Sequence, residues 1–356
     1  MDKTIKIHFK SCIILFLGMA CTVLYLWLSL KQMVPSILHV PVVRKIWDTE
    51  YSKCVLHQET EIHSPLYINF SLHGRLGNWM FAYASLIGIA MRNNRQPFIS
   101  KYSSLSSIFK LQHTLSWQPV CLDDFTEQYP CKYDYHTENL PRINLTLKQY
   151  FQSWKYFEGY ESEVRKEFTF WPNIYSKART IFLNYTENIS NTSIYVSVHV
   201  RRTDMMIPSS TKLGFKSAPL EYINNAMSYM RKKFVGKTIK FLVVSDDYLW
   251  CSKHLREPDT VIIPQNHQFV DIAILSMCNH SIITTGTYGW WGAWLAGGHT
   301  VYYRNFPEPG TRLDKDLDPA DFYLPDWVAM DTGTQKNCNQ DLMISIVLIS
   351  LLFLVL

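Results

Sequence analysis

Two arginines and an aspartate follow an apolar stretch of alternating pattern, at the point where a β-strand is expected to end. Residues 193–200 (SIYVSVHV) have that pattern, and Arg201, Arg202 and Asp204 come directly after it. Guanidinium groups bind phosphates in a bidentate way, and a nearby carboxylate can orient one of them. His199 shares a strand face with Arg201, although a histidine in a buried strand often serves only the core. The segment predicts an anion-binding site, and a solvated charged loop is the alternative.

A glycine-containing loop lies between a predicted strand and a predicted helix at residues 281–298 (SIITTGTYGWWGAWLAGG). The apolar strand runs into Thr285, Gly286 and Thr287, and Tyr288 follows near the start of a helix rich in small and aromatic residues. Backbone N–H groups at such a helix start bind anions, with the helix dipole behind them. We expect a second anion-binding element here. A helix that is simply buried, with bulky tryptophans, is the alternative.

A third predicted strand leads into two glycines at residues 71–80 (SLHGRLGNWM). The strand is expected to end at Leu72, and the glycines permit a tight turn before a helix that begins near Asn78. Arg75 and Asn78 are then placed to bind a ligand. Close packing of the strand against the helix is the alternative reason for the glycines.

A fourth predicted strand, at residues 241–250 (FLVVSDDYLW), ends in a hydroxyl and two carboxylates. Ser245, Asp246 and Asp247 can accept hydrogen bonds from ribose hydroxyls or base amines. They can equally cap the following helix, a role that serine and aspartate often have.

The order of these elements predicts the fold class. Strand patterns alternate with helical patterns between Pro65 and Trp327: strands at 67–72, 193–200, 240–247, 260–264 and 281–286, and helices at 78–94, 219–233 and 269–279. Such alternation is typical of parallel α/β units, and two of them separated by a polar loop indicate a two-lobed protein. Ligands in such sheets bind beyond the carboxyl ends of the strands, where all four segments lie.

An uncharged apolar stretch near the N-terminus predicts a membrane anchor. Residues 12–30 contain no charge, and Lys3, Lys6 and Lys10 precede them. About 20 apolar residues span a bilayer, and positive flanks stay in the cytosol. We expect a signal anchor, with a cleaved signal peptide as the alternative.

Sequons and cysteines beyond the anchor agree with a lumenal body. Six N-x-S/T sequons begin at Asn69, Asn144, Asn184, Asn188, Asn191 and Asn279. Six of the eight cysteines follow residue 31, an even number that suits disulfides in an oxidising compartment. The apolar stretch at 343–356 is short for a membrane span.

In sequence order these segments resemble a known family. HVRRTD (199–204) is similar to the H-x-R-R-x-D motif of the α1,2-, α1,6- and protein O-fucosyltransferases. Four further segments resemble the galactoside α1,2-fucosyltransferases, family 11 of the glycosyltransferases: GRLGN (74–78), YASL (83–86), YFQSWKYF (150–157) and TTGTYGWWGAWLAGG (284–298). The match covers most of residues 67–300. Trp79 and Thr203 depart from the family pattern, which usually has Gln and Gly there.

The resemblance implies a fold and a reaction. The fold is α/β with two Rossmann-like lobes of GT-B type, and the reaction is inverting transfer of fucose from GDP-fucose to the 2-hydroxyl of a terminal galactoside, without a metal. Arg201 stabilises charge on the β-phosphate as the fucose bond breaks, and Asn78 faces the reacting sugar. Arg202 positions the loop or a phosphate, and Asp204 supports both arginines. Further donor-binding residues implied are Arg75, Ser245, Asp246, Asp247, Thr285, Gly286, Thr287 and Tyr288.

The proton acceptor is left open at this point. His199 and Asp204 are candidates for the general base. A dissociative step in which the leaving phosphate takes the proton needs no protein base.

The sequence pattern, together with the resemblance, gives the expected organisation. It runs as follows: cytosolic tail 1–11, transmembrane signal anchor 12–30, stem 31–64, N-terminal acceptor-side lobe 65–190, C-terminal donor-binding lobe 191–330, and polar spacer with apolar tail 331–356. We expect a single-pass type II protein of the Golgi membrane, N-glycosylated, acting on galactoside-terminated glycans of glycoproteins or glycolipids. The acceptor loops are expected within residues 98–150, which carry no readable motif.

Other functions fit the sequence less well. The D-x-D sequences in RLDKDLDP (312–319) have no apolar strand before them, so we expect a charged surface loop and no metal site. A net charge of +5 is too small for a nucleic-acid-binding protein. The alternatives that stay open are a fucosyltransferase of another linkage (protein O-linked or N-glycan core) and a non-catalytic lumenal glycan-binding protein.

Overall fold

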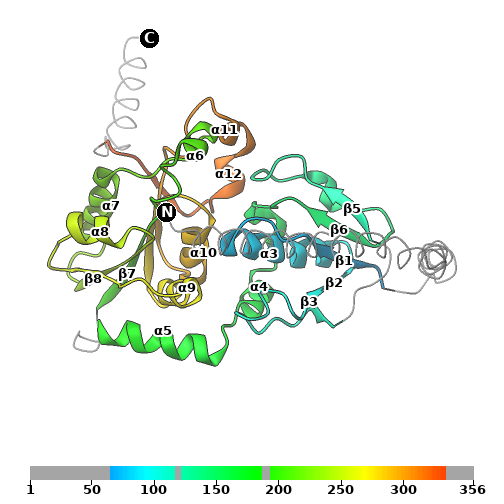
Figure 1. Cartoon of the computed structure of the whole chain (residues 1–356), viewed down its shortest axis with the longest axis horizontal. Coiled ribbons are helices and arrows are strands. Elements are labelled where there is room, and N and C mark those ends of the chain that lie inside the picture. Colours follow the sequence, from blue (N-terminus) through cyan, green and yellow to red (C-terminus); the bar gives the residue numbers. More distant parts are fainter. Residues whose placement is uncertain (1–64, 117–121, 187–192, 334–356) are drawn as a thin grey trace, which may run out of the picture. The chain divides into compact units, whose positions relative to one another are not determined.

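The computed structural model describes residues 65–116, 122–186 and 193–333 (Figure 1). They belong to a compact unit that begins at Pro65. Several predicted features lie outside these residues: the cytosolic tail, the signal anchor, the stem, the apolar tail and the sequons at Asn188 and Asn191. Within the described ranges, every helix is too short or too polar to cross a membrane.

The N-terminal lobe, residues 65–171, is built on a parallel sheet with the strand order β2-β1-β6-β5. Its strands are β1 Tyr67–Phe70, β2 Gln96–Pro97, β5 Asp123–Thr126 and β6 Leu145–Lys148, with a separate parallel pair β3 Ile99–Ser100 and β4 Thr114–Leu115. The helices are α3 Leu76–Arg92, η1 Tyr135–Glu138, η2 Trp154–Phe157 and α4 Glu161–Glu167.

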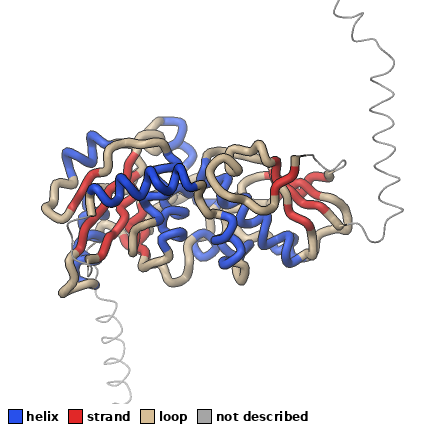
Figure 2. Tube along the Cα trace, turned by 90° about the horizontal axis from the view of Figure 1, so that it is seen from below, coloured by secondary structure: helices blue, strands red, loops and turns tan. Residues whose placement is uncertain are grey.

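The C-terminal lobe, residues 172–333, has a parallel sheet with the order β12-β11-β10-β7-β8-β9. Its strands are β7 Ile194–Val200, β8 Ile239–Ser245, β9 Thr260–Ile262, β10 His280–Ile283, β11 Thr300–Tyr303 and β12 Val328–Met330. Its helices are α5 Pro172–Asn184, α6 Pro208–Leu213, α7 Leu220–Lys233, α8 Tyr248–His254, α9 Gln268–Ser276, α10 Thr287–Ala296, α11 Arg312–Asp316 and α12 Pro319–Phe322. The expected α/β class with parallel sheets is confirmed, and Figure 2 shows the two groups of strands with helices between them.

Helix α5, which precedes the predicted boundary between the lobes, packs on the C-terminal lobe. Helix α5 packs against α9 of the C-terminal lobe. Ala178 of α5 lies in one buried cluster with Leu242 and Val244 of β8. The predicted boundary between residues 190 and 191 follows this helix. The amphipathic helix before it already covers the second sheet.

Helix α3 connects the first strand to the lobe junction. Strand β1 ends at Phe70, not at Leu72, and α3 begins at Leu76 because Arg75 O accepts hydrogen bonds from the N–H groups of Asn78 and Trp79. The helix is apolar nearly all round, so it is buried between β1, η2 and α10. Trp79 is half-buried and packs against the core.

Large aromatic side chains fill the junction between α3 and α10, which lie side by side in Figure 1. The ring of Phe81 lies 4.5 Å from that of Trp290 and 5.1 Å from that of Trp291, between centroids. Phe157 stacks on Trp291 at 5.8 Å. These tryptophans are part of the core, as the alternative interpretation of this helix predicted. They also hold the start of α10 in place.

The YFQSWKYF segment (150–157) holds helix α12 of the C-terminal lobe. Ser153 Oγ donates to the carbonyl of Asp321 at 2.8 Å, and Trp154 Nε1 donates to the carbonyl of Ala320 at 3.1 Å. Lys155 pairs with the Asp321 carboxylate at 2.6 Å. Helix α12 is thereby fastened to the N-terminal lobe.

The RLDKDLDP segment is not the loop that the sequence suggested. It forms α11 and the start of α12, and its carboxylates are engaged locally: Asp314 accepts from the Gly310 N–H, Asp316 pairs with Arg312, and Asp318 caps α12 through the Ala320 N–H. One helix cap, one ion pair and one hydrogen bond to the backbone thus account for the three aspartates.

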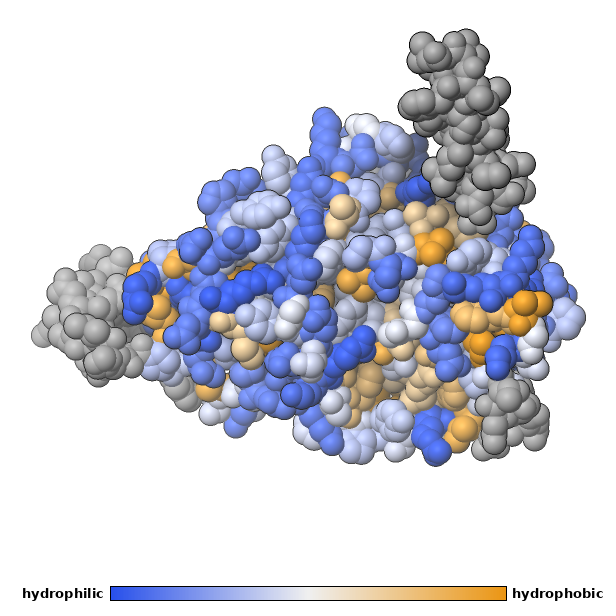
Figure 3. All heavy atoms as spheres, turned by 180° about the vertical axis from the view of Figure 1, so that it is seen from behind, coloured by the Kyte–Doolittle hydropathy of each residue, from blue (hydrophilic) through white to orange (hydrophobic). Residues whose placement is uncertain are grey.

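The described cysteines are free thiols. Cys131, Cys251 and Cys278 are all buried and unpaired by disulfides, which differs from the expectation drawn from the even count. The face shown in Figure 3 is mostly hydrophilic, with apolar residues in scattered patches, because the large side chains lie in the core.

Candidate active site

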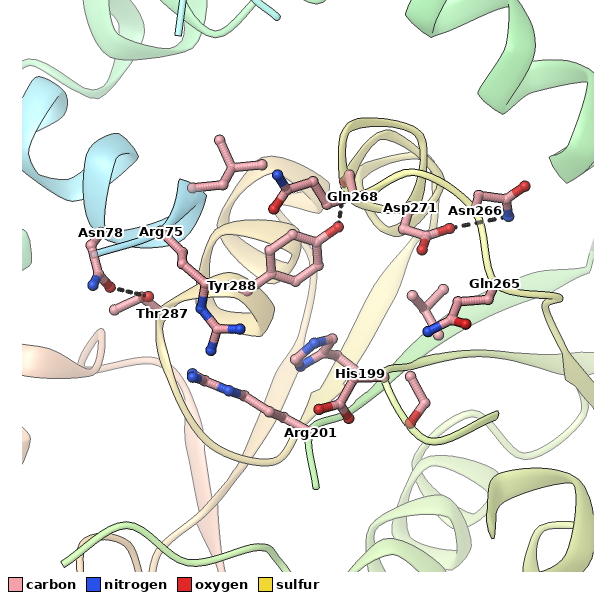
Figure 4. Close-up of a pocket in the computed structure, with 15 residues that line it drawn as sticks. Arg75, Asn78, His199, Arg201, Gln265, Asn266, Gln268, Asp271, Thr287 and Tyr288 are labelled. Atoms are coloured by element: carbon pink, nitrogen blue, oxygen red, sulfur yellow. Dashed lines mark hydrogen bonds between the residues drawn. The ribbon is translucent and has the colours of Figure 1, made fainter. Parts of the chain in front are cut away.

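A cavity of about 230 Å³ opens where the turn before α3 meets the carboxyl ends of β7 and β8 and the start of α10 (Figure 4). Eight of the residues predicted from the sequence line it: Arg75, Asn78, His199, Arg201, Ser245, Asp246, Thr287 and Tyr288. The parallel strands explain this convergence, since their carboxyl ends share one edge of the sheet.

Arg201 is held rigidly at the cavity wall. Its Nε and Nη2 atoms donate to the two carboxylate oxygens of Asp204 at 3.0 and 2.7 Å. Its backbone N–H donates to Thr284 Oγ1 at 3.1 Å. The remaining nitrogen, Nη1, lies against Gly286, where a Cβ atom would overlap it. One edge of the guanidinium is fixed, and the other is presented beside the α10 loop.

Asp204 is shared between the lobes. Arg75, from the N-terminal lobe, pairs with the same carboxylate as Arg201. Partial burial alone would raise the pKa of Asp204, but hydrogen bonds and charge from Arg201 and Arg75 hold that pKa below its usual value. Two cations share one anion, so this wall of the cavity carries an excess positive charge that suits an anionic ligand.

The His199 side chain lines the cavity and is uncharged. It is 6% exposed, its ring lies 5.3 Å from that of Tyr288, and its Nδ1 atom is buried with no hydrogen-bond partner among the described residues. Burial lowers the pKa of His199 to about 4, with Asp246 acting in the opposite direction. The imidazole is neutral near pH 7, so it can accept or donate a hydrogen bond to a ligand.

The start of α10 is an open helix terminus. Gly286 stands at its N-cap with φ +85° and supplies no side-chain cap. Thr287 Oγ1 donates to Asn78 Oδ1 at 2.7 Å, which ties α10 to α3. A Cβ on Gly77 would lie 2.7 Å from the Tyr288 nitrogen, so only glycine allows the helices to approach this closely. Backbone N–H groups at such a terminus bind anions.

Arg202 does not line the cavity, unlike Arg201. Its guanidinium lies 3.9 Å from the centre of the Trp250 ring, and its Nε donates to Asp247 at 3.3 Å. Of the two roles predicted for Arg202, the geometry favours positioning of the loop over contact with a phosphate.

The acidic pair after β8 has two different roles. Asp246 accepts from the backbone N–H groups of Arg202 and Thr203 at 2.9 and 3.1 Å, and also from the Thr203 hydroxyl. Asp247 caps α8 through the Trp250 N–H at 3.1 Å, as the capping alternative expected. Thr203, which departs from the family pattern, thus adds a hydrogen bond that fixes the loop.

Two predicted loop residues also lie outside the cavity lining, Thr285 and Gly286. Thr285 is 2% exposed, and its hydroxyl has no partner within the described part of the chain. Gly286 contributes through its backbone conformation, since it makes room for Arg201.

Sequence reasoning missed the far wall of the cavity, which is formed by Gln265, Asn266, Gln268 and Asp271. Asp271 is 8% exposed, and its carboxylate accepts from Asn266 Nδ2 at 3.1 Å. Burial raises the pKa of Asp271 above its usual value. The signal was present in the sequence, since Asp271 is the single acid in the apolar helix FVDIAIL.

Metal ligands do not gather here. Across the described ranges, no group of three or more His, Cys, Asp or Glu side chains is arranged to hold an ion. The positive charge at this cavity comes from Arg75, Arg201 and the α10 terminus.

Comparison with known proteins identifies the family. The model of glycosyl transferase family 11 matches residues 33–331. Galactoside 2-alpha-L-fucosyltransferase SEC1 of Bos taurus is 32% identical over 283 residues, covering 75% of this chain and 73% of its own. Galactoside alpha-(1,2)-fucosyltransferase 2 of Sus scrofa is 30% identical over 274 residues, covering 72% and 78%.

Among solved structures, fucosyltransferase NodZ from Bradyrhizobium aligns with a TM-score of 0.45 and 12% identity, over 64% of this chain and 91% of that chain. The family model covers far more than half of the sequence, and the relatives match it over nearly three quarters of its length. The chain therefore belongs to glycosyl transferase family 11.

Proposed function

We propose that this protein transfers fucose from GDP-fucose, with inversion, to the 2-hydroxyl of a terminal galactoside. The observation that carries the proposal is the placement of Arg201, fixed on Asp204 with its free edge beside the open start of α10. The names of the curated relatives, which are galactoside 2-alpha-L-fucosyltransferases, supply the sugar and the linkage.

The diphosphate of the donor would lie between Arg201 and the N-terminus of α10. Guanidinium nitrogens and helix N–H groups are the donors that phosphate oxygens require. Arg75 supplies a second positive charge from the opposite lobe.

The guanine base would lie against the far wall of the cavity. Guanine presents two neighbouring N–H donors, and the buried Asp271 carboxylate is an acceptor of matching chemistry. Asn266 and Gln265 add amide groups for the remaining edge.

Catalysis consists of breaking the bond between fucose C1 and the β-phosphate oxygen while the acceptor hydroxyl attacks the opposite face of C1. Negative charge builds on the leaving phosphate, and a preorganised guanidinium stabilises it more in the transition state than in the ground state. Asn78, which lies across the cavity on α3, would face the fucose.

We propose a dissociative step in which the acceptor proton reaches the leaving phosphate through water, because the acceptor hydroxyl and the phosphate lie on opposite faces of C1. His199 is a weak base because burial lowers its pKa to about 4. Asp204 has both carboxylate oxygens engaged by Arg201 and one also by Arg75. The diphosphate gains basicity as the glycosidic bond breaks, so it is the better acceptor.

The finer features of the protein belong to the same proposal. We propose that the two lobes form a GT-B arrangement, that residues 12–30 anchor the chain in the Golgi membrane with the lobes in the lumen, and that the reaction needs no metal. The uncharged run behind three lysines and the cationic cavity wall support this.

The test is transfer by the full chain from GDP-fucose to a β-galactoside in the presence of EDTA, with the product linkage read by NMR. An α-linked fucose on the 2-hydroxyl supports the proposal. Fucose on another hydroxyl or on a protein side chain would favour the other-linkage alternative. No transfer to any acceptor by folded protein would favour the glycan-binding alternative.

A further inference from the structure

The turn after β6 holds two non-glycine residues in the left-handed region of backbone space. Gln149 has φ +93° and Phe151 has φ +48°. Such backbone strain persists only where the surrounding structure imposes it. The turn runs into the YFQSWKYF segment, whose later residues fasten α12 but whose first residues, Tyr150 and Phe151, do not line the donor cavity.

A buried carboxyl group imposes this conformation. Glu127 is 4% exposed, and its Oε1 atom accepts from the N–H groups of Tyr150 and Phe151 at 2.6 and 2.7 Å. The Phe151 ring is fully buried and lies 5.4 Å from that of Tyr156. The hydrogen bonds to Glu127 and the buried Phe151 ring hold the turn in place. The side chain of its central residue, Tyr150, is only half-buried.

The turn lies beside the segment that leads into the donor cavity. Strands β1 and β6 pair in parallel with Phe70 opposite Leu147, and Ser71 N donates to Leu147 O at 3.0 Å. The Tyr150 ring lies 6.0 Å from the His73 ring. His73 is two residues before Arg75, so the two Cα atoms are at most about 7 Å apart.

The polar groups presented here are not engaged. Gln149 and His73 are exposed and Tyr150 is half-buried. The Gln149 amide, the Tyr150 hydroxyl and the His73 imidazole make no hydrogen bond to any described residue. A sugar is recognised by an aromatic surface for its apolar face together with donors and acceptors for its hydroxyls. These three side chains supply both.

We propose that Gln149, Tyr150 and His73 form the subsite for the acceptor sugar, and that Glu127 is a positioning residue that holds the turn in its strained conformation. The ligand class is a β-linked hexopyranoside with free hydroxyls. The inference rests on the proposed function, because it assigns the acceptor side of the same reaction.

The first test is Tyr150→Ala in the full chain, with Tyr175→Ala as the matched control. Tyr175 is an exposed tyrosine on α5, outside the cavity lining. Tyr150→Ala is expected to raise the KM for a β-galactoside about tenfold or more and to leave the KM for GDP-fucose within about twofold. Tyr175→Ala should change neither. An unchanged acceptor KM, or equal rises in both KM values, would overturn the assignment.

The positioning role of Glu127 is tested by a pair of variants. Glu127→Gln keeps the acceptor oxygen for both N–H groups, whereas Glu127→Ala removes it. The glutamine variant should retain an acceptor KM within about threefold, and the alanine variant should raise it about tenfold at a nearly unchanged donor KM. A destabilised fold without a specific site would change both KM values together, which would contradict a positioning role.

A direct measurement of acceptor binding distinguishes failure of the proposed function from failure of the proposed subsite. Saturation-transfer NMR with methyl β-galactoside and the GDP-bound full chain should give ring-proton signals that Tyr150→Ala abolishes and Tyr175→Ala keeps. If wild type transfers no fucose but shows this pattern, the proposed reaction fails and the subsite stands. If wild type transfers fucose but binding is equal in both variants, the subsite is wrong.

Discussion

Replacement of Gly286 by alanine tests whether the loop geometry exists to seat Arg201. Gly286 has φ +85°, and a Cβ atom there would overlap Arg201 Nη1 and lie 3.3 Å from its Cζ. The neighbour is the end of a side chain and not backbone, so the protein can fold. The guanidinium must then move by roughly 1 Å to regain van der Waals distance.

The substitution is expected to lower both the stability of the fold and the rate of transfer, and the two effects are measured separately. An alanine at φ +85° and ψ 172°, a backbone conformation that almost only glycine adopts, costs roughly 1–3 kcal/mol of folding free energy. Misplacing a catalytic group by about 1 Å costs about 100-fold in rate, which corresponds to about 3 kcal/mol of transition-state stabilisation. We therefore expect Gly286→Ala to lose far more activity than stability.

Gly236→Ala is the matched control. Gly236 has φ +83°, and a Cβ there would meet no atom within 4 Å. It precedes β8 and so lies at the opposite edge of the sheet from the cavity. Thermal unfolding should show similar losses of stability for both variants, while fucosyl transfer at saturating substrate should fall about 100-fold only in Gly286→Ala. If the two variants retain equal kcat values, Arg201 is not the group that the loop positions.

Three further outcomes are expected. Arg202→Ala removes the contact with Trp250 and should lower the free energy of unfolding by about 1–2 kcal/mol, with less than about a tenfold loss of kcat in steady-state assays. Asp318→Ala removes the α12 cap and should cost about 1 kcal/mol in urea denaturation, with transfer unchanged in EDTA; lost activity would mean that this aspartate has a role in the reaction. Burial raises the pKa of Glu127 to about 8, above its unfolded value, so it stabilises the fold below the unfolded pKa and this contribution is lost as the pH rises through about 8. Urea denaturation between about pH 5 and pH 9 should show a decline of a few kcal/mol for wild type that Glu127→Gln reduces.

The second sheet was largely predictable because its central strands are mostly buried. β7 and β8 each have seven residues, most of them apolar, and their carboxyl ends carry the polar groups that converge on the cavity. Parallel topology then fixes which residues meet, so Arg201, Asp246 and Thr287 could be brought together from the sequence pattern alone.

The first sheet was harder because its strands are short. β2 has two residues and β5 is largely exposed, so neither shows a clear period. The hydrogen bonds from the turn at 149–151 to Glu127 depend on the pairing between β5 and β6. No local sequence pattern predicts that pairing. The stacking of Arg202 on Trp250 is likewise a tertiary contact that the sequence does not predict. This contact gives Arg202 a different role from Arg201, although the two arginines look equivalent in the sequence.

The most direct test of the central claim is the rate of fucosyl transfer by Arg201→Lys. Lysine keeps the charge but lacks the fork that binds Asp204 on one side and faces Gly286 on the other. We predict a fall in kcat of about 100- to 1,000-fold, with the melting temperature changed by only a few degrees. A kcat within about threefold of wild type would show that Arg201 contributes charge alone, and that its fixed geometry has no part in catalysis.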